Sequence, residues 1–162
     1  MTNADVYNKG QLKTGRIVKA IAGFYFVEAG SGLYAEDGGM RREVYPCKAR
    51  GLFRKLGQSP LVGDMVRFTP PPDGPLNGEG PCCPVPEKDF KTGLVEELLE
   101  QRNSLIRPPL ANLDTLYIVS SYASPAPSHL VIDKLTAIAV HKGIEPVLVF
   151  NKCDQGDFAR WR

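Results

Sequence analysis

The chain has 162 residues, of which 43% are hydrophobic and 23% charged, a composition that fits one globular domain or two small ones. No apolar run reaches the ~18 residues of a transmembrane helix, and the polar start MTNADVYNKGQLK lacks the apolar core of a signal peptide, which predicts a cytoplasmic protein with no membrane partner. The net charge of +2 divides unevenly, because residues 1–69 hold 11 Lys and Arg against 6 Asp and Glu, whereas residues 70–162 hold 9 against 12. A basic half joined to an acidic half predicts two modules with different partners.

The N-terminal part of the chain predicts β-structure. Residues 15–29, GRIVKAIAGFYFVEA, predict two strands separated by a break at Gly23, because β-branched and aromatic residues dominate both arms. The glycine-rich residues 30–42 predict a loop. Residues 43–50 form an extended run whose Pro46 predicts an edge or bulged strand, since proline cannot donate a ladder hydrogen bond.

Four further segments follow before residue 101. A helical turn is predicted near 52–56, and the alternating residues 65–69, MVRFT, predict a half-buried strand. The proline- and glycine-rich residues 70–91 predict a long surface loop, while residues 93–100 fit either a strand or a helix. About five short strands with glycine-rich turns are typical of a small barrel, either an OB-fold or an SH3-like barrel.

The sequence changes character after residue 101. Prolines 108 and 109 stop any helix in residues 102–114, which therefore predict a linker. Residues 115–120, TLYIVS, and residues 146–150, PVLVF, are continuous apolar runs that predict two strands of a parallel sheet, each buried on both faces.

The segment between these two strands predicts a helix over residues 129–142. Ser128 is a suitable N-cap and Gly143 a suitable stop, and the two histidines, His129 and His141, are expected on the helix surface. One β-α-β unit cannot bury both faces of its sheet, so the chain is expected to be part of a longer protein or to borrow a partner. The apolar positions expected to face the sheet are Leu130, Leu135, Ile138 and Ala139.

The four cysteines, Cys47, Cys82, Cys83 and Cys153, lack the C-x-x-C spacing of a metal site. Free thiols are expected instead, since the predicted compartment is reducing. With only two separated histidines, the sequence predicts neither a metal site nor a catalytic residue in this chain, and it argues against a zinc-linked redox protein.

Directly after the second apolar run stands Asn151-Lys152-Cys153-Asp154, which has the N-K-x-D pattern that reads guanine in GTPases. The Asp154 carboxylate can accept two parallel N–H bonds from the guanine edge, which adenine cannot offer. Asn151 can bond the purine and neighbouring loops, and the Lys152 stem can lie over the base plane. The alternative is a polar helix start, in which Asp154 caps the following segment.

A GTPase also needs a phosphate-binding loop of the form G-x-x-x-x-G-K-[ST], and this sequence contains none. The loop is therefore either absent or located beyond Arg162 in a permuted order.

Several stretches resemble the RsgA (YjeQ) family of circularly permuted, ribosome small subunit-dependent GTPases. They are GRIVKAIAGFYFV at 15–27, CKARGLFRK at 47–55, PLVGDMVRF at 60–68, RNSLIRPPLANLD at 102–114 and GIEPVLVFNKCD at 143–154. The resemblance implies an OB-fold barrel followed by the first part of an α/β GTPase domain that uses GTP or GDP with Mg²⁺, and a later zinc-binding domain. It also implies a monomer that acts on the small ribosomal subunit and its rRNA in late maturation. The loops at 30–45 and 70–91 look longer than the family's usual turns.

A group of basic residues, Lys48, Arg50, Arg54 and Lys55, follows the third predicted strand, and Arg16, Lys19 and Arg67 lie on neighbouring strands. OB-folds hold nucleic acid with positive grooves and stacked aromatic rings, and the resemblance to the RsgA family favours rRNA as the ligand of the group of four. The alternative is a solvated basic surface. For the aromatic residues Phe24, Tyr25, Phe26 and Phe53, core packing is the favoured interpretation over base stacking.

Together these features predict an OB-fold over residues 1–101, a linker over 102–114 and the first piece of a GTPase domain over 115–162. The chain would supply the guanine-binding motif and an RNA-docking barrel to a GTP hydrolase but would be inactive alone. The alternative is a non-enzymatic OB-fold RNA-binding module. A G-x-x-x-x-G-K-[ST] motif within several tens of residues beyond Arg162 would decide for the hydrolase.

Overall fold

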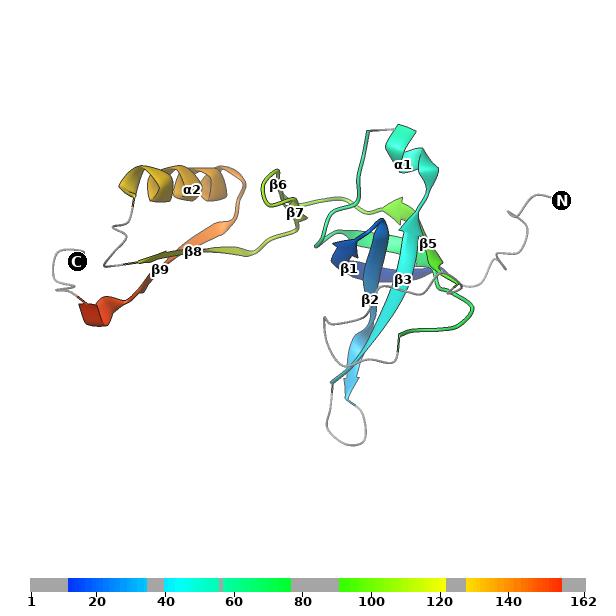
Figure 1. Cartoon of the computed structure of the whole chain (residues 1–162). Helices are drawn as coiled ribbons and strands as arrows, with labels where there is room; N and C mark the ends of the chain where they lie inside the picture. Colours follow the sequence, from blue (N-terminus) through cyan, green and yellow to red (C-terminus); the bar gives the residue numbers. More distant parts are fainter. Residues whose placement is uncertain (1–11, 35–39, 56, 77–90, 122–127, 156–162) are drawn as a thin grey trace. The chain divides into compact units, whose positions relative to one another are not determined.

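The computed structural model describes residues 12–34, 40–55, 57–76, 91–121 and 128–155 (Figure 1). Residues 30–34, 40–42 and 54 are described by their backbone alone. The chain divides into two compact units, the first formed by residues 1–101 and 105–111 and the second by residues 102–104 and 112–162.

The first unit is a closed barrel of five strands in the order β1-β2-β3-β5-β4. The β3–β5 pair is parallel and every other neighbouring pair is antiparallel, which is the arrangement of an OB-fold and decides against an SH3-like barrel. A short helix, α1 (Gly51–Lys55), follows β3 and confirms the predicted helical turn. The strands are β1 (Lys13–Ile21), β2 (Phe24–Tyr34), β3 (Met40–Ala49), β4 (Met65–Thr69) and β5 (Gly93–Leu98).

The structure settles one expectation for the barrel and corrects another. Residues 93–98, which fitted either a strand or a helix, form strand β5. The predicted loop over 30–42 is wrong for residues 30–34 and 40–42, because β2 and β3 extend into a long hairpin arm whose register shifts between Ala29 and Leu33. A bulge of this kind leaves the extra residues of one strand unpaired, and the β2–β3 pairing continues beyond it. Of the predicted loop 70–91, residues 77–90 lie outside the described part.

The barrel core follows the two-residue alternation of its strands. Ile17, Val27, Val66, Phe68 and Val95 are fully buried from four different strands and point to the barrel axis. The break between β1 and β2 is the predicted one, and it is a tight turn at Ala22 and Gly23, both with positive φ.

A two-stranded hairpin, β6 (Ser104–Leu105) and β7 (Leu110–Ala111), lies within the segment 102–114, for which the sequence predicts a linker. Its residues 105–111 belong to the first unit, where Leu110 forms a parallel bridge with Val62 and the Ala111 N–H donates to the Val62 carbonyl at 2.9 Å. The tip of the hairpin contains a cis peptide bond between Arg107 and Pro108.

The turn that receives the hairpin is built around Gly63 and Asp64. Gly63 has φ +98°, and a Cβ at this position would overlap the carbonyl oxygen of Ala111. Asp64 is completely buried, and its carboxylate accepts hydrogen bonds from the Leu61 N–H and from Gln101 Nε2, both at 2.7 Å. The two bonds compensate the cost of burying the charge.

The second unit contains β8 (Thr115–Ser121), α2 (His129–His141), β9 (Glu145–Asn151) and the short 3₁₀ helix η1 (Cys153–Gln155). β8 and β9 are parallel and paired in register from Thr115–Glu145 to Ser121–Asn151, as predicted. α2 begins after Ser128 and ends before Gly143, whose φ of +67° confirms it as the stop. The Ser128 side chain makes no capping hydrogen bond.

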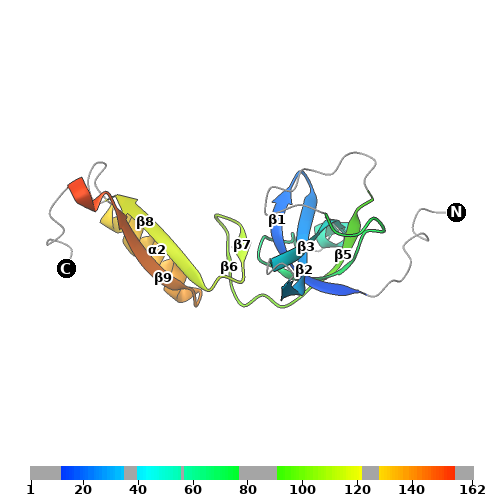
Figure 2. The same cartoon turned by 90° about the horizontal axis from the view of Figure 1, so that it is seen from below.

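The expectation that β8 and β9 are buried on both faces is wrong for this chain. Figures 1 and 2 show α2 along one face of the pair, and the exposed fractions of Tyr117 and Val119 are 66% and 65%. The expected helix face is corrected as well, because Ile132 and Ala139 are its buried residues. Three of the four residues expected to face the sheet, Leu130, Leu135 and Ile138, are exposed.

Candidate functional site

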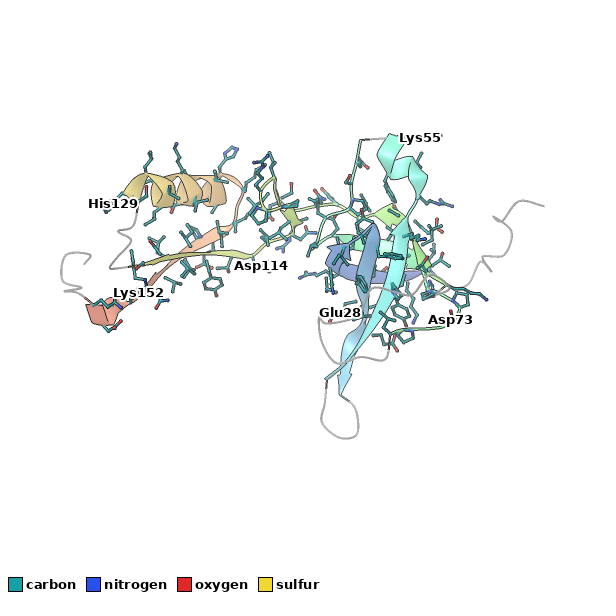
Figure 3. All side chains as sticks on the ribbon, in the orientation of Figure 1. Glu28, Lys55, Asp73, Asp114, His129 and Lys152 are labelled. Atoms are coloured by element: carbon teal, nitrogen blue, oxygen red, sulfur yellow. The ribbon has the colours of Figure 1, made fainter. Side chains whose placement is uncertain are left out.

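The N-K-x-D motif begins at the carboxyl end of β9. Asn151 is the last residue of the strand and pairs in register with Ser121, the last residue of β8, so the carboxyl ends of both parallel strands lie side by side. Figure 3 labels Lys152 at this end of the second unit. The carboxyl edge of a parallel sheet is where α/β proteins bind their ligands.

A tight backbone turn holds the motif. The Lys152 N–H donates to Asn151 Oδ1 at 2.8 Å, and Lys152 has a left-handed φ of +60° that turns the chain out of the strand. The Gln155 N–H then donates to the Lys152 carbonyl at 3.1 Å, which closes η1. The Cys153 thiol donates to the Phe150 carbonyl at 3.3 Å, so the residue between Lys152 and Asp154 is tied back to the strand.

All four motif residues, Asn151 to Asp154, are exposed. Within the described residues, no donor contacts the Asp154 carboxylate, so both of its oxygens are open to a ligand with two parallel N–H groups. The alternative, in which Asp154 caps a following helix, concerns residues 156–162, which lie outside the described part.

Ser121 is a neighbour of the motif that the sequence analysis did not select. Its hydroxyl oxygen is buried and is the one buried side-chain oxygen or nitrogen of the described residues without a hydrogen-bond partner. The register places it opposite Asn151. A serine at the end of an apolar strand carries no signal in the sequence, because only the pairing of β8 with β9 brings it to the site.

The predicted RNA-binding residues of the barrel have different environments. The Lys48 ammonium lies over the Phe24 ring, 5.3 Å from its centroid, and Arg50 forms an ion pair with Glu96 at 2.9 Å. Lys55 is exposed at the end of α1 (Figure 3). The side chain of Arg54 lies outside the described part.

The basic residues on the neighbouring strands, Lys19 and Arg67, also have partners. Lys19 lies 5.3 Å over the Phe26 ring, and Arg67 forms an ion pair with Glu97 at 3.1 Å. Phe53 is buried in the barrel core, in agreement with the favoured interpretation of core packing, and Phe26 is buried in a second apolar cluster with Val44. Acidic partners on β5 thus reduce the positive charge that the residue count suggests, because both Arg50 and Arg67 are paired.

A polar cluster braces one end of the barrel. Lys13 Nζ donates to the Tyr45 phenol oxygen, and that phenol donates to Glu43 Oε2, both at 2.6 Å. The bond to Tyr45 raises the pKa of Lys13, the bond from Tyr45 lowers the pKa of Glu43, and burial raises the pKa of Tyr45. These contacts link β1 with β3.

The residues that could hold a metal do not come together. No group of three or more His, Cys, Asp or Glu converges in the described part of the chain, so the Mg²⁺ and zinc implied by the resemblance find no ligand set there. Cys47 is a buried free thiol whose pKa burial raises to about 12, and Cys153 is free and exposed. Cys82 and Cys83 lie outside the described residues. None of the described helices is long and apolar enough to cross a membrane.

Comparison with known proteins agrees with both units. Residues 14–74 match the family model described as RsgA N-terminal domain, and residues 98–160 match the one described as RsgA GTPase. The chain belongs to the RsgA family.

Curated RsgA relatives resemble most of the chain. The small ribosomal subunit biogenesis GTPase RsgA 2 of Oceanobacillus iheyensis is 35% identical over 140 residues, which is 86% of this chain and 38% of the relative. The RsgA of Carboxydothermus hydrogenoformans is 38% identical over 140 residues, 86% of this chain and 39% of the relative. The chain therefore spans about two fifths of the length of these RsgA proteins.

Two solved structures share the fold. The crystal structure of YloQ, a circularly permuted GTPase, has a TM-score of 0.63 and 31% identity, and the match covers 93% of this chain and 44% of YloQ. YjeQ from Thermotoga maritima has a TM-score of 0.64 and 29% identity, with 94% of this chain and 45% of YjeQ covered. An OB-fold barrel followed by part of a GTPase domain is the architecture of this chain.

Proposed function

We propose that this chain provides the guanine-recognition site of a GTPase. The observation that carries the proposal is the N-K-x-D motif at the carboxyl end of β9, with an exposed Asp154 in a turn fixed by Asn151 and Lys152. Its support is the match of residues 98–160 to the RsgA GTPase model.

The chemistry follows from the side chains. The Asp154 carboxylate accepts the N1 and N2 hydrogens of guanine, whereas adenine would leave this charged acceptor unpaired. The Lys152 stem covers one face of the base and places its charge near the ribose and phosphates. Because Asn151 Oδ1 already accepts the Lys152 N–H, the Asn151 amide group remains to donate to the purine or to a neighbouring loop.

The whole protein in this proposal hydrolyses GTP to GDP and phosphate during late maturation of the small ribosomal subunit in the cytoplasm. It transfers the terminal phosphoryl group to water mainly by positioning and electrostatic stabilisation. The phosphate-binding loop, the Mg²⁺ ligands and the zinc site would come from polypeptide that follows residue 162 in the full-length protein, since the relatives are longer. This chain would contribute base recognition and no catalytic residue.

The barrel, in the same proposal, docks on rRNA of the small subunit through Lys48, Arg50, Arg54 and Lys55. Lys48 and Lys55 are exposed cations, whereas Arg50 would first have to leave Glu96 or act together with it. Phosphate contacts of this kind fix position without reading sequence.

A second candidate is a non-enzymatic RNA-binding module, which the closed five-stranded barrel with its exposed Lys48 and Lys55 favours. Nucleotide competition on the full-length protein separates the two. GTP and GDP should displace a labelled guanine nucleotide and ATP should not. Equal displacement by ATP and GTP, or no nucleotide binding at all, would reject guanine recognition and leave the RNA-binding module.

A further inference from the structure

The two faces of the β2–β3 pair differ in what covers them. Tyr45 and Cys47 point into the barrel core, so the alternate residues of both strands point outward. An outward face normally contacts solvent, yet three of these residues are almost completely buried. They are Phe26 at 1% exposed, Val44 at 9%, and Pro46 at below 2%.

A segment of the chain itself covers this outer face. Residues 70–76, which we call the strap, leave the end of β4 and return to β3, where the Leu76 N–H donates to the Val44 carbonyl at 2.8 Å and forms an antiparallel bridge. The strap is the green segment beside β3 in Figure 1. Leu76 and the half-buried Phe24 pack against Phe26 and Val44 and form a small apolar cluster outside the barrel.

The position of the strap matters because of the fold. In OB-folds, the face formed by strands 2 and 3 and the connection between strands 4 and 5 bind oligonucleotides. Here the strap is the first part of that connection and lies on that face. The one charged residue of the strap, Asp73 (labelled in Figure 3), is exposed.

Beneath the strap is the set of groups that a base-stacking surface needs. Phe24 and Phe26 are two residues apart on β2, and a lysine ammonium lies 5.3 Å from the centroid of each ring, Lys48 at Phe24 and Lys19 at Phe26. Single-stranded nucleic acid binds to rings of this kind flanked by cations that track the phosphates. With Leu76 packed against it, Phe26 is only 1% exposed.

We propose that the strap is an autoinhibitory element, and that single-stranded RNA must displace it before bases stack on Phe24 and Phe26. This inference rests on the proposed role of the barrel in binding RNA. Among the described residues, Leu76 is held by one backbone hydrogen bond to β3 and by the packing of its side chain against Phe26 and Val44, a small set of contacts that a local opening can break. The apparent RNA affinity is then the intrinsic affinity reduced by the fraction of molecules with the strap open.

Hydrogen–deuterium exchange on the unmodified 162-residue chain tests the displacement directly. The probe is a single-stranded oligouridylate of about 10 nucleotides, within the site size of one OB-fold. At saturating RNA, the Leu76 amide should exchange faster than in the free chain. Unchanged or slower exchange at Leu76 while the RNA is bound would overturn the proposal.

A substitution series tests the competition. Leu76→Ala loosens the strap and should raise the affinity for the oligouridylate by about threefold or more. Leu12→Ala, at an exposed leucine just before β1, is the matched control and should change nothing. Adding Phe24→Leu to Leu76→Ala should abolish the gain, because leucine preserves an apolar side chain but offers no ring. A duplex RNA of the same length should gain nothing from Leu76→Ala, since its bases are already stacked.

The outcomes separate the two proposals. If the Leu76→Ala and Leu12→Ala chains bind the oligouridylate equally well, the strap does not compete and the inference fails, while RNA binding by the barrel stands. If neither chain binds any RNA, both the strap and the proposed RNA role of the barrel are rejected. Thermal unfolding followed by circular dichroism checks that each variant is folded.

Discussion

The Lys13 ammonium lies 2.6 Å from the Tyr45 phenol oxygen, although the strands that carry them, β1 and β3, are not neighbours in the barrel. The contact bridges β1 and β3 across the barrel end, and Glu43 completes it by accepting the phenol hydrogen at 2.6 Å. The Tyr45 hydroxyl therefore accepts a hydrogen bond from the Lys13 ammonium and donates one to the Glu43 carboxylate. Both hydrogen-bonding functions of this hydroxyl are satisfied although the ring that carries it is buried.

Removing the phenol oxygen should weaken the barrel. Tyr45→Phe keeps the ring that packs on Phe68 but removes two charge-assisted hydrogen bonds, so we expect a loss of about 1 kcal/mol in unfolding free energy. Hydrogen exchange of the β1 and β3 amides measures this loss of unfolding free energy. Tyr117→Phe, at a tyrosine that is 66% exposed in the second unit, should leave these amides unchanged.

The same cluster predicts a pH dependence. The hydrogen bond from Tyr45 lowers the pKa of Glu43, so its stabilising contribution is complete above the ordinary value of about 4.3 and is lost as the pH falls through the lower value of the folded state. Glu43→Gln should remove this acid-side loss from the stability profile measured between pH 7 and about pH 3. An unchanged profile in the variant would show that the bond to Glu43 contributes nothing in solution.

At alkaline pH the cluster is expected to lose stability as the pH rises, the opposite direction from the loss at acid pH. The bond to Tyr45 raises the pKa of Lys13, and burial raises the pKa of Tyr45. Both contributions are present below about pH 10, the ordinary range of the two groups, and are lost as the pH rises through their higher folded values. Tyr45→Phe should remove this alkaline loss, as measured by the same exchange experiment.

Gly63 should tolerate no side chain. Its φ of +98° disfavours any L-residue, and a Cβ would overlap the Ala111 carbonyl oxygen that the β6–β7 hairpin presents. Gly63→Ala should cost more than about 2 kcal/mol, because strain and overlap add. Gly51→Ala is the matched control, since Gly51 begins α1 with open space around it and should lose nothing. Thermal unfolding of both variants measures the difference.

Local patterns predicted the barrel strands, because alternation and β-branched residues act over a few positions. The extension of β2 and β3 through 30–34 and 40–42 could not be predicted in this way, since glycine-rich sequence has no strand preference and the two arms stabilise each other by pairing. The two-sided burial of β8 failed for a different reason. Its apolar run is typical of a sheet with two covered faces, whereas among the described residues α2 covers one face and Tyr117 and Val119 on β8 are exposed.

The N-K-x-D motif can be located from the sequence because its four residues are contiguous, and its role in guanine binding stays a prediction. The ion pairs Arg50–Glu96 and Arg67–Glu97 could not, since their partners are distant in sequence and meet only when β5 pairs with β4 and β3. Ser121 joins the site through a pairing of the same kind. The packing of the strap against Phe26 could not be predicted either, because its proline-rich sequence predicts only a loop.

Asp154→Asn should exchange the base preference of the full-length protein from guanine to xanthine. The asparagine amide can donate to the xanthine O2, where the aspartate accepted from the guanine N2. GTP affinity should fall about 10-fold or more, the range expected when a charged hydrogen-bond acceptor is lost. Competition between GTP and XTP measures this. Asp133→Asn, an exposed carboxylate on α2, is the control and should keep the guanine preference.

The 162-residue chain by itself should release no phosphate from GTP above the uncatalysed background. Guanine recognition contributes binding, whereas turnover needs a phosphate-binding loop and a Mg²⁺ ligand, and the sequence has no G-x-x-x-x-G-K-[ST]. Phosphate release by the purified chain measures it. Turnover that disappears in an Asp154→Ala chain would contradict the prediction, because it would show a complete site within these residues.

Neutralising exposed cations of the barrel should weaken its attachment to small-subunit RNA and reduce the salt dependence. Lys48→Gln with Lys55→Gln removes two exposed charges that have no acidic partner among the described residues, and should flatten the slope of log K against log salt by about 1–2 units. Lys134→Gln with Lys142→Gln, at exposed lysines of the second unit, is the matched control with the same change in net charge. Small-subunit binding at several salt concentrations measures both pairs. If the two pairs lower the slope equally, the RNA responds to overall charge and the barrel residues form only a solvated surface.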